Sequence, residues 1–86
     1  MNYDLLREKG YSGPESLYEV RAWIRKKYNL HLELFFSIYH KTWSVNNYII
    51  DLKKGKRAPY TYTCKSFDNY EDALLFSLQL ILTFIK

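Results

Sequence analysis

The sequence predicts an α+β domain of two layers, in which a three-stranded antiparallel meander is covered on one face by two helices. Two patterns indicate this class: an apolar residue at every second position over 30–39, and a helical spacing of apolar residues both before it and over 70–85. Short connections between the predicted strands favour antiparallel neighbours, because a parallel pair needs a long crossover. The predicted order is therefore helix, three strands, helix.

The first predicted helix follows Pro14, which suits a first turn, and ends at Asn29, which readily adopts the left-handed conformation. Ser16 and Glu19 match a capping box, in which each side chain bonds a free backbone N–H at the start of the helix. Spacings of three and four place four apolar residues on one helix face: Leu17, Val20, Ile24 and Tyr28.

The first predicted strand alternates strictly, and successive side chains of a strand point to opposite faces. A turn at 40–42 leads to the second strand, 43–52. Its apolar residues fall first on odd-numbered and then on even-numbered positions, so a regular strand would place them on opposite faces. A bulge at Asn46-Asn47 would return its apolar residues to one face, and the alternative is a central strand that is buried on both faces. A polar loop over 53–59 then leads to a third strand over 60–67.

The last predicted helix, 70–85, is apolar around most of its circumference. Asp68 or Asn69 caps it, and Glu71 and Asp72 lie in the first turn, where the helix dipole favours negative charge. One sheet and one neighbouring helix leave part of so apolar a helix uncovered, which favours contact with a partner subunit. The predicted core comprises Leu17, Val20, Ile24, Leu32, Leu34, Phe36, Ile38, Trp43, Ile50, Leu74, Leu78 and Ile81.

With 86 residues and a net charge of +4, the chain is expected to form one domain over 14–86, preceded by a lead-in segment over 1–13 that either packs on it or frays. The single Cys64 excludes an intrachain disulfide, and the start of the chain lacks the apolar core of a secretory signal. The apolar run over 73–85 is shorter than the about 20 residues that a membrane span needs. We therefore expect a cytoplasmic protein with no membrane contact.

The sequence indicates neither an enzyme nor a cofactor. His31 and His40 are its only histidines, and together with Cys64 they show no spacing typical of a metal site. The three glycines form no phosphate-binding loop. Capping explains the carboxylates at the start of the last helix, so we expect no catalytic, cofactor-binding or metal-binding residues.

A basic loop is the first candidate binding surface, because clustered positive charge neutralises the phosphates of nucleic acids. The predicted contacts are Lys53, Lys54, Lys56, Arg57 and Lys65. The competing interpretation is a solvated loop whose charge keeps the protein soluble, and it is favoured because charge alone specifies little. Nucleic-acid binding by the loop 53–57 is therefore the alternative function.

An apolar surface is the second candidate. Phe35 and Tyr39 lie on the strand face opposite the leucines, where uncovered aromatic side chains favour a protein partner. The competing interpretation is that residues 1–13 fold across them. The predicted interface comprises Phe35, Tyr39, Phe76, Leu80 and Phe84. We therefore expect a non-catalytic protein-interaction domain that forms a homodimer, through the last helix or a sheet edge, or that binds another protein.

The predicted order of elements resembles that of the double-stranded-RNA-binding domain. That family carries a Lys-rich cluster at the start of its last helix and a Gly-Pro-x-His turn between its first two strands. Here the segment Phe67–Asp72 is acidic, and the turn reads His40-Lys41-Thr42. The resemblance therefore implies the topology and does not imply RNA binding.

Short motifs resemble a family of small uncharacterised proteins from Bacteroides-type bacteria and their phages or conjugative elements. The motifs are Trp23-Ile24-Arg25-Lys26-Lys27-Tyr28, a strand led by Trp43, and Phe67-Asp68-Asn69-Tyr70-Glu71-Asp72-Ala73. The resemblance covers residues 17–86. It implies a small intracellular protein linked to a mobile element, and it implies no activity, cofactor or partner.

Overall fold

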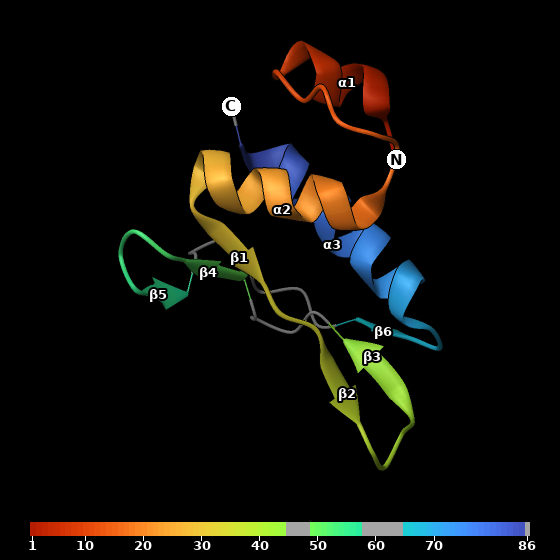
Figure 1. Cartoon of the computed structure of the whole chain (residues 1–86). Coiled ribbons are helices and arrows are strands. Elements are labelled where there is room, and N and C mark those ends of the chain that lie inside the picture. The colour runs from red at the N-terminus through yellow and green to blue at the C-terminus, as the bar shows by residue number, and fades with distance from the viewer. Residues whose placement is uncertain (45–48, 58–64, 86) are drawn as a thin grey trace.

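The computed structural model describes residues 1–44, 49–57 and 65–85, and it confirms the predicted α+β class (Figure 1). The helices are α1 (Tyr3–Glu8), α2 (Leu17–Tyr28) and α3 (Tyr70–Phe84). The strands are β1 (Leu30–Leu32), β2 (Phe35–Ser37), β3 (Thr42–Ser44), β4 (Ile49–Asp51), β5 (Lys56–Arg57) and β6 (Ser66–Phe67). Within these ranges, no helix is long and apolar enough to cross a membrane.

The ends of α2 follow the local signals only in part. Asn29 ends the helix in the left-handed conformation, with a φ of 58°. Ser16 is the N-cap residue, but its side chain makes no capping hydrogen bond, so the predicted capping box is wrong. The backbone N–H of Ser16 instead donates to the carbonyl of Pro14 at 2.8 Å, and Glu19 lines a surface pocket. The backbone N–H of Ser16 therefore has its acceptor without the Glu19 carboxylate.

The N-terminus of α3 is capped by Asn69, one of the two predicted caps. Its Oδ1 accepts a hydrogen bond from the backbone N–H of Asp72 at 2.8 Å. Its Nδ2 donates to the Asp72 carboxylate, also at 2.8 Å. These two bonds satisfy a backbone donor that the helix itself leaves unpaired and hold both side chains in place.

We expect the substitution Asn69→Ala to lower the free energy of unfolding by about 1 kcal/mol, because it leaves that N–H without its acceptor. Asp68→Ala is the matched control, since Asp68 is exposed and precedes the cap. Its expected change is below about 0.5 kcal/mol. Urea unfolding followed by tryptophan fluorescence measures both variants, and equal losses would contradict the assignment of the cap to Asn69.

The strands form two small antiparallel sheets, with the orders β1-β4-β5 and β2-β3-β6. The order β2-β3-β6 follows the predicted meander, whereas the order β1-β4-β5 takes its third strand from the predicted loop. The predicted strand over 30–39 is interrupted at 33–34. Its first part, β1, belongs to one sheet and its second part, β2, to the other. The prediction of a loop over 53–59 is wrong for Lys56 and Arg57, which form β5 and pair with β4. The predicted bulge at Asn46-Asn47 and most of the predicted strand 60–67 lie outside the described residues.

The register places Ile50 on a different face from the one predicted. Residues directly opposite each other in an antiparallel pair point to the same side of the sheet. Leu32 lies opposite Ile49, whereas Ile50 lies opposite His31. Leu30 and Leu32 are buried against α2, and Ile50 is only half buried.

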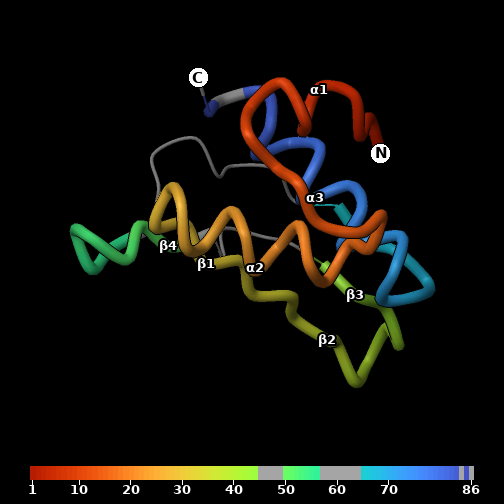
Figure 2. The backbone as a smooth tube through the Cα atoms, turned by 45° about the horizontal axis from the view of Figure 1, so that its top comes forward, coloured from red at the N-terminus to blue at the C-terminus, as the bar shows by residue number. Residues whose placement is uncertain are grey.

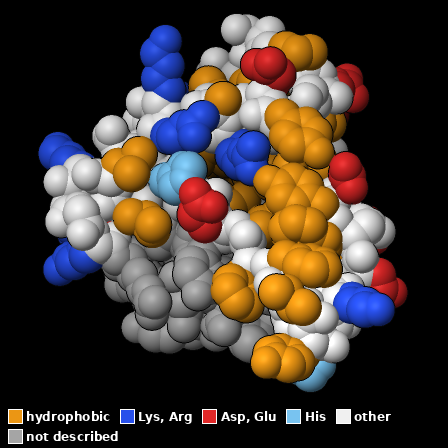
Figure 3. Space-filling model, turned by 60° about the horizontal axis from the view of Figure 1, so that its bottom comes forward, with side chains coloured by type: hydrophobic (Ala, Val, Ile, Leu, Met, Phe, Trp, Pro, Cys, Tyr) orange, Lys and Arg blue, Asp and Glu red, His pale blue; other side chains and the backbone are white. Residues whose placement is uncertain are grey.

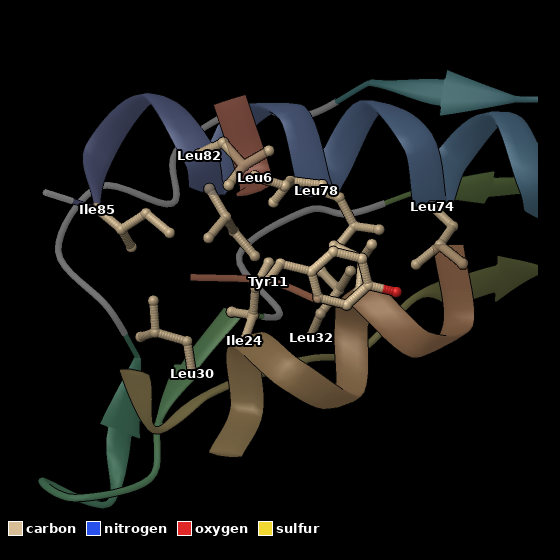
Figure 4. Packing of buried hydrophobic residues seen from close by; sticks show 11 residues of the cluster. Leu6, Tyr11, Ile24, Leu30, Leu32, Leu74, Leu78, Leu82 and Ile85 are labelled. Carbon is tan, nitrogen blue, oxygen red and sulfur yellow. The ribbon is translucent and has the colours of Figure 1, made fainter. Parts of the chain in front are cut away.

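The core lies between α2, α3 and β1, and α1 completes it (Figure 4). The fully buried Leu6 of α1 lies beside Leu78 and Leu82 of α3. The ammonium of Lys9 donates to the carbonyl of Ile85 at 3.2 Å and so ties the segment to the end of α3. Residues 1–13 therefore pack on the domain instead of fraying.

Most of the predicted core is confirmed. The buried members are Val20, Ile24, Leu32, Leu74, Leu78 and Ile81. Leu17 and Leu34 are half buried and pack against these residues. Trp43 is half buried but packs on Tyr70 and Phe36. The prediction is wrong for Ile50, which is half buried on the other face of its sheet. The prediction is wrong for Phe36 and Ile38, which are 41% and 79% exposed. The β2–β3 hairpin extends beyond the two long helices, so the alternation continues where no helix covers it (Figures 1 and 2).

Candidate functional site

The predicted basic loop forms the tip of the β4–β5 hairpin. The backbone N–H groups of Lys53 and Lys54 donate to the carboxylate of Asp51 at 3.0 and 3.1 Å. Gly55, with a φ of 69°, closes the turn by donating its N–H to the Asp51 carbonyl. The side chains of Lys53, Lys54 and Lys56 are exposed, and none of them forms an ion pair with another described residue. The loop therefore presents positive charge from a fixed turn.

The other two predicted basic contacts are not gathered at this tip. The backbone of Arg57 pairs with Ile50, and its side chain lies outside the described part of the structure. The ammonium of Lys65 lies 5.6 Å from the ring centroid of Phe67 and 5.0 Å from that of Phe76. Such cation–π contacts hold Lys65 beside β6, on the other side of the molecule from β5 (Figure 1).

The outer side of α3 offers little apolar surface among its described side chains. Phe76 is half buried and packs on Phe67, with ring centroids 5.3 Å apart. Leu80 is also half buried, and the side chain of Phe84 lies outside the description. The exposed described residues of this helix are polar: Glu71, Asp72, Gln79 and Thr83.

The β2–β3 hairpin carries the largest exposed apolar side chains that the structure describes. We name Phe35, Phe36, Ile38 and Tyr39 the hairpin patch. Tyr39 is 95% exposed and Phe35 is 51% exposed. Residues 1–13 lie on the side of the molecule opposite this hairpin (Figure 2), so the interpretation that they fold across Phe35 and Tyr39 is wrong. Their apolar side chains are used instead to cover α3.

Four aromatic rings, which we name the aromatic ladder, join this hairpin to the first turns of α2 and α3. Tyr18 and Tyr70 lie parallel, with centroids 6.2 Å apart and 7° between the planes. Tyr70 meets Trp43 edge to face at 5.0 Å, and Trp43 meets Phe36 at 4.8 Å. Figure 3 shows apolar side chains gathered in a column on one face, with charged side chains beside it. Phe36 belongs to both groups and points to the same side as Trp43, whereas Phe35 points to the other face of β2.

Polar contacts hold the upper end of the ladder. Arg21 donates to the Tyr70 hydroxyl at 2.5 Å, and its guanidinium lies 5.6 Å from the ring centroid of Tyr18. The Tyr18 hydroxyl donates to the carboxylate of Glu71 at 3.2 Å. Desolvation, followed by this bond to a carboxylate, raises the pKa of Tyr18 above its ordinary value. Tyr18 therefore stays protonated at neutral pH and keeps its donor bond.

The titratable groups near the sheet are explained by local contacts. The ring of His31 bridges Arg25, at 3.5 Å, and Glu33, at 2.5 Å. His40 is exposed in the turn after β2. Among the residues that the structure describes, no three His, Cys, Asp or Glu side chains are placed to hold a metal ion. Cys64 lies outside those residues.

A surface pocket of about 290 Å³ lies between residues 11–13 and α2. Tyr11 and Trp23 form one wall, with their rings edge to face at 5.5 Å. Burial, followed by the nearby carboxylate of Glu19, raises the pKa of Tyr11. Glu19 and Lys26 add exposed charges of opposite sign. Because small-molecule sites need several converging polar groups and usually exceed about 300 Å³, we assign this pocket no ligand.

The ladder residues Tyr18 and Tyr70 were not predicted from the sequence. Tyr18 lies off the apolar face of α2, and Tyr70 directly follows the cap of α3, so each resembles an ordinary surface tyrosine. Tyr18 and Tyr70 are 52 positions apart in the sequence, so no local pattern predicts that their rings are in contact. The available signal was the composition, with nine Tyr and two Trp in a short chain.

Comparisons of this chain with protein-family models, with curated proteins and with solved structures found no match. The resemblance carried by the sequence motifs therefore stays a prediction. What this chain binds has to be argued from the surface formed by the hairpin patch and the aromatic ladder.

Proposed function

We propose that this chain is a non-catalytic protein-interaction domain that binds its partner through the hairpin patch. One observation carries the proposal. Among the described residues, six large hydrophobic side chains are exposed, and four of them fall within residues 35–39. Single exposed hydrophobic residues are ordinary on a protein surface, whereas several within one hairpin indicate a contact site. A link to a mobile element, which the sequence resemblance implies, is part of the same proposal.

The aromatic ladder makes this surface suited to binding. Tyrosine and tryptophan are enriched at protein interfaces, because they bury a large area and lose few rotatable bonds. Trp43 and Tyr70 are already held by ring contacts, and Tyr70 is also held by Arg21. Binding would therefore cost less conformational entropy here than at a surface of free, flexible side chains.

This proposal moves the contact away from α3, which the sequence had favoured for self-association. The apolar face of α3 is covered by α1, α2 and β1. Its half-buried Phe76 has intramolecular partners in Phe67 and Lys65. In the hairpin patch, by contrast, Ile38 and Tyr39 are 79% and 95% exposed.

A pull-down from native cells tests the proposal. The tagged wild-type chain is compared with the double variant Ile38→Lys/Tyr39→Lys by quantitative mass spectrometry. Two charges placed in an apolar contact are expected to remove the captured partner, because each would be buried without a counter-ion. Leu52→Lys is the matched control, since Leu52 is 48% exposed on the other hairpin. Capture of the same proteins by all three forms would overturn the proposal.

Nucleic-acid binding by the basic loop is the second candidate. Exposed Lys53, Lys54 and Lys56, unpaired within the described structure, support it. Fluorescence anisotropy with a short duplex RNA or DNA should then show binding that weakens with salt and on Lys53→Gln/Lys54→Gln. Arg7→Gln/Lys26→Gln removes the same charge elsewhere and serves as the control. Equal affinity of the two double variants would exclude the loop as the contact.

A further inference from the structure

The tip of the β2–β3 hairpin is a fixed turn that projects an aromatic side chain into solvent. The backbone N–H of Lys41 donates to the carbonyl of Ser37 at 2.7 Å, and that of His40 donates to the Ser37 hydroxyl at 3.2 Å. Lys41 takes the left-handed conformation there, with a φ of 54°. Tyr39 lies within this turn and is 95% exposed. An aromatic side chain on a turn fixed in this way is suited to fill a pocket on a partner, because little backbone freedom is lost on binding.

The surface pocket between residues 11–13 and α2, which we name the Tyr11–Trp23 pocket, matches such a side chain in size. Its volume is about 290 Å³, whereas a cavity of about 150 Å³ already holds a benzene ring. Tyr11 and Trp23 supply aromatic walls, and the small side chain of Ala22 lines the pocket from α2. The pocket is therefore too small for the usual small-molecule ligand but large enough for one tyrosine ring.

The charges beside the turn and the pocket have opposite signs. Lys41 follows Tyr39 by two residues, and Glu19 lines the pocket. Both charged side chains are exposed, and neither forms an ion pair with another described residue. Lys26 also lines the pocket, but it lies two helical turns from Glu19, at a rise of about 10 Å along α2. A turn that enters with Lys41 toward Glu19 therefore gains an opposite charge and keeps Lys41 away from Lys26.

We infer that the partner is a second copy of this chain, whose Tyr11–Trp23 pocket receives Tyr39. This inference rests on the proposed function, because it names the occupant of the same hairpin. Residues 1–13 lie on the side of the molecule opposite the hairpin (Figure 2), so one chain does not fill its own pocket. The contact is therefore heterologous, and each bound copy still offers a turn or a pocket to a further copy. Association is expected to continue beyond a dimer as the protein concentration rises.

Sedimentation equilibrium on two single variants tests the arrangement. Tyr39→Ala removes the ring from the turn, and Ala22→Phe fills the pocket from α2. Each variant alone is expected to associate about 30-fold more weakly than the wild type, because every copy lacks one of the two surfaces. Each variant keeps the other surface, so an equimolar mixture is expected to form a dimer and to stop there. Leu52→Ala is the matched control, since Leu52 is 48% exposed on the other hairpin, and it should associate like the wild type.

Three outcomes overturn the inference: a wild-type chain that stays monomeric, single variants that associate like the wild type, or a mixture that stays monomeric. Urea unfolding of each variant shows beforehand that it is folded. The proposed function fails separately, if the Ile38→Lys/Tyr39→Lys variant captures the same proteins as the wild type. A monomeric wild type that still captures a hairpin-dependent partner would overturn only the second copy as occupant.

Discussion

Replacing Leu6 with alanine is expected to lower the free energy of unfolding by about 2–4 kcal/mol. Leu6 is fully buried against α3, and α1 is too short to keep it there without this contact. The loss combines the transfer of the removed atoms to water with the cavity that they leave. For a domain of this length the total stability is about 4–13 kcal/mol, so the substitution removes a large share of it.

Leu5→Ala is the matched control for this prediction. Leu5 has the same side chain and lies in the same helix, but it is only half buried. Its expected loss is about 1 kcal/mol or less, because less apolar area leaves the core. Urea unfolding followed by tryptophan fluorescence compares the two, with the m-value as a check that the compactness of the unfolded state is unchanged. Small and equal losses would mean that residues 1–13 do not belong to the core.

The helices were predictable because their ends depend on a few neighbouring residues. Asn29 takes the left-handed conformation, and Asn69 accepts from the third residue after it, as their chemistry favours. The capping box failed at Ser16 because the preceding turn already bonds its N–H to Pro14. Even this local motif was therefore decided by the backbone that leads into it.

The candidate binding surfaces could not be predicted in full, because they depend on which helices and strands lie side by side in the fold. The ladder needs Tyr18, Trp43 and Tyr70 to converge from a helix, a strand and a second helix. The lysines of the basic loop were predictable because one turn holds them all. Lys65 instead directly precedes β6 and contacts the ring of Phe67, in the part of the molecule that holds the other sheet.

The strand over 30–39 shows the same limit. Alternation identifies which residues share one face of a strand. It does not show how far along the strand the helices that cover this face extend. β1 lies under α2, and β2 lies beyond it. Leu32 and Ile38 therefore have the same position in the pattern and different surroundings in the structure.

That difference yields the second large expected effect. Leu32→Ala should lower the free energy of unfolding by about 2–4 kcal/mol, because Leu32 is 2% exposed and its loss opens a cavity beneath α2. Ile38→Ala should change it by less than about 0.5 kcal/mol, because Ile38 is 79% exposed. Leu32 and Ile38 are both aliphatic and were predicted to share one strand face. The chief difference between them is that Leu32 is buried and Ile38 is exposed.

The same pair separates folding from association. Because Leu32 lies in the core, its truncation acts on unfolding at every protein concentration. Because Ile38 lies in the hairpin patch, its truncation should leave the chain stable and weaken capture of the proposed partner through lost apolar contact. Urea unfolding of both variants measures the first effect, and the pull-down with quantitative mass spectrometry measures the second. A loss of stability in Ile38→Ala as large as that in Leu32→Ala would place the hairpin against the body of the domain, and the surface proposed for binding would then be part of its core.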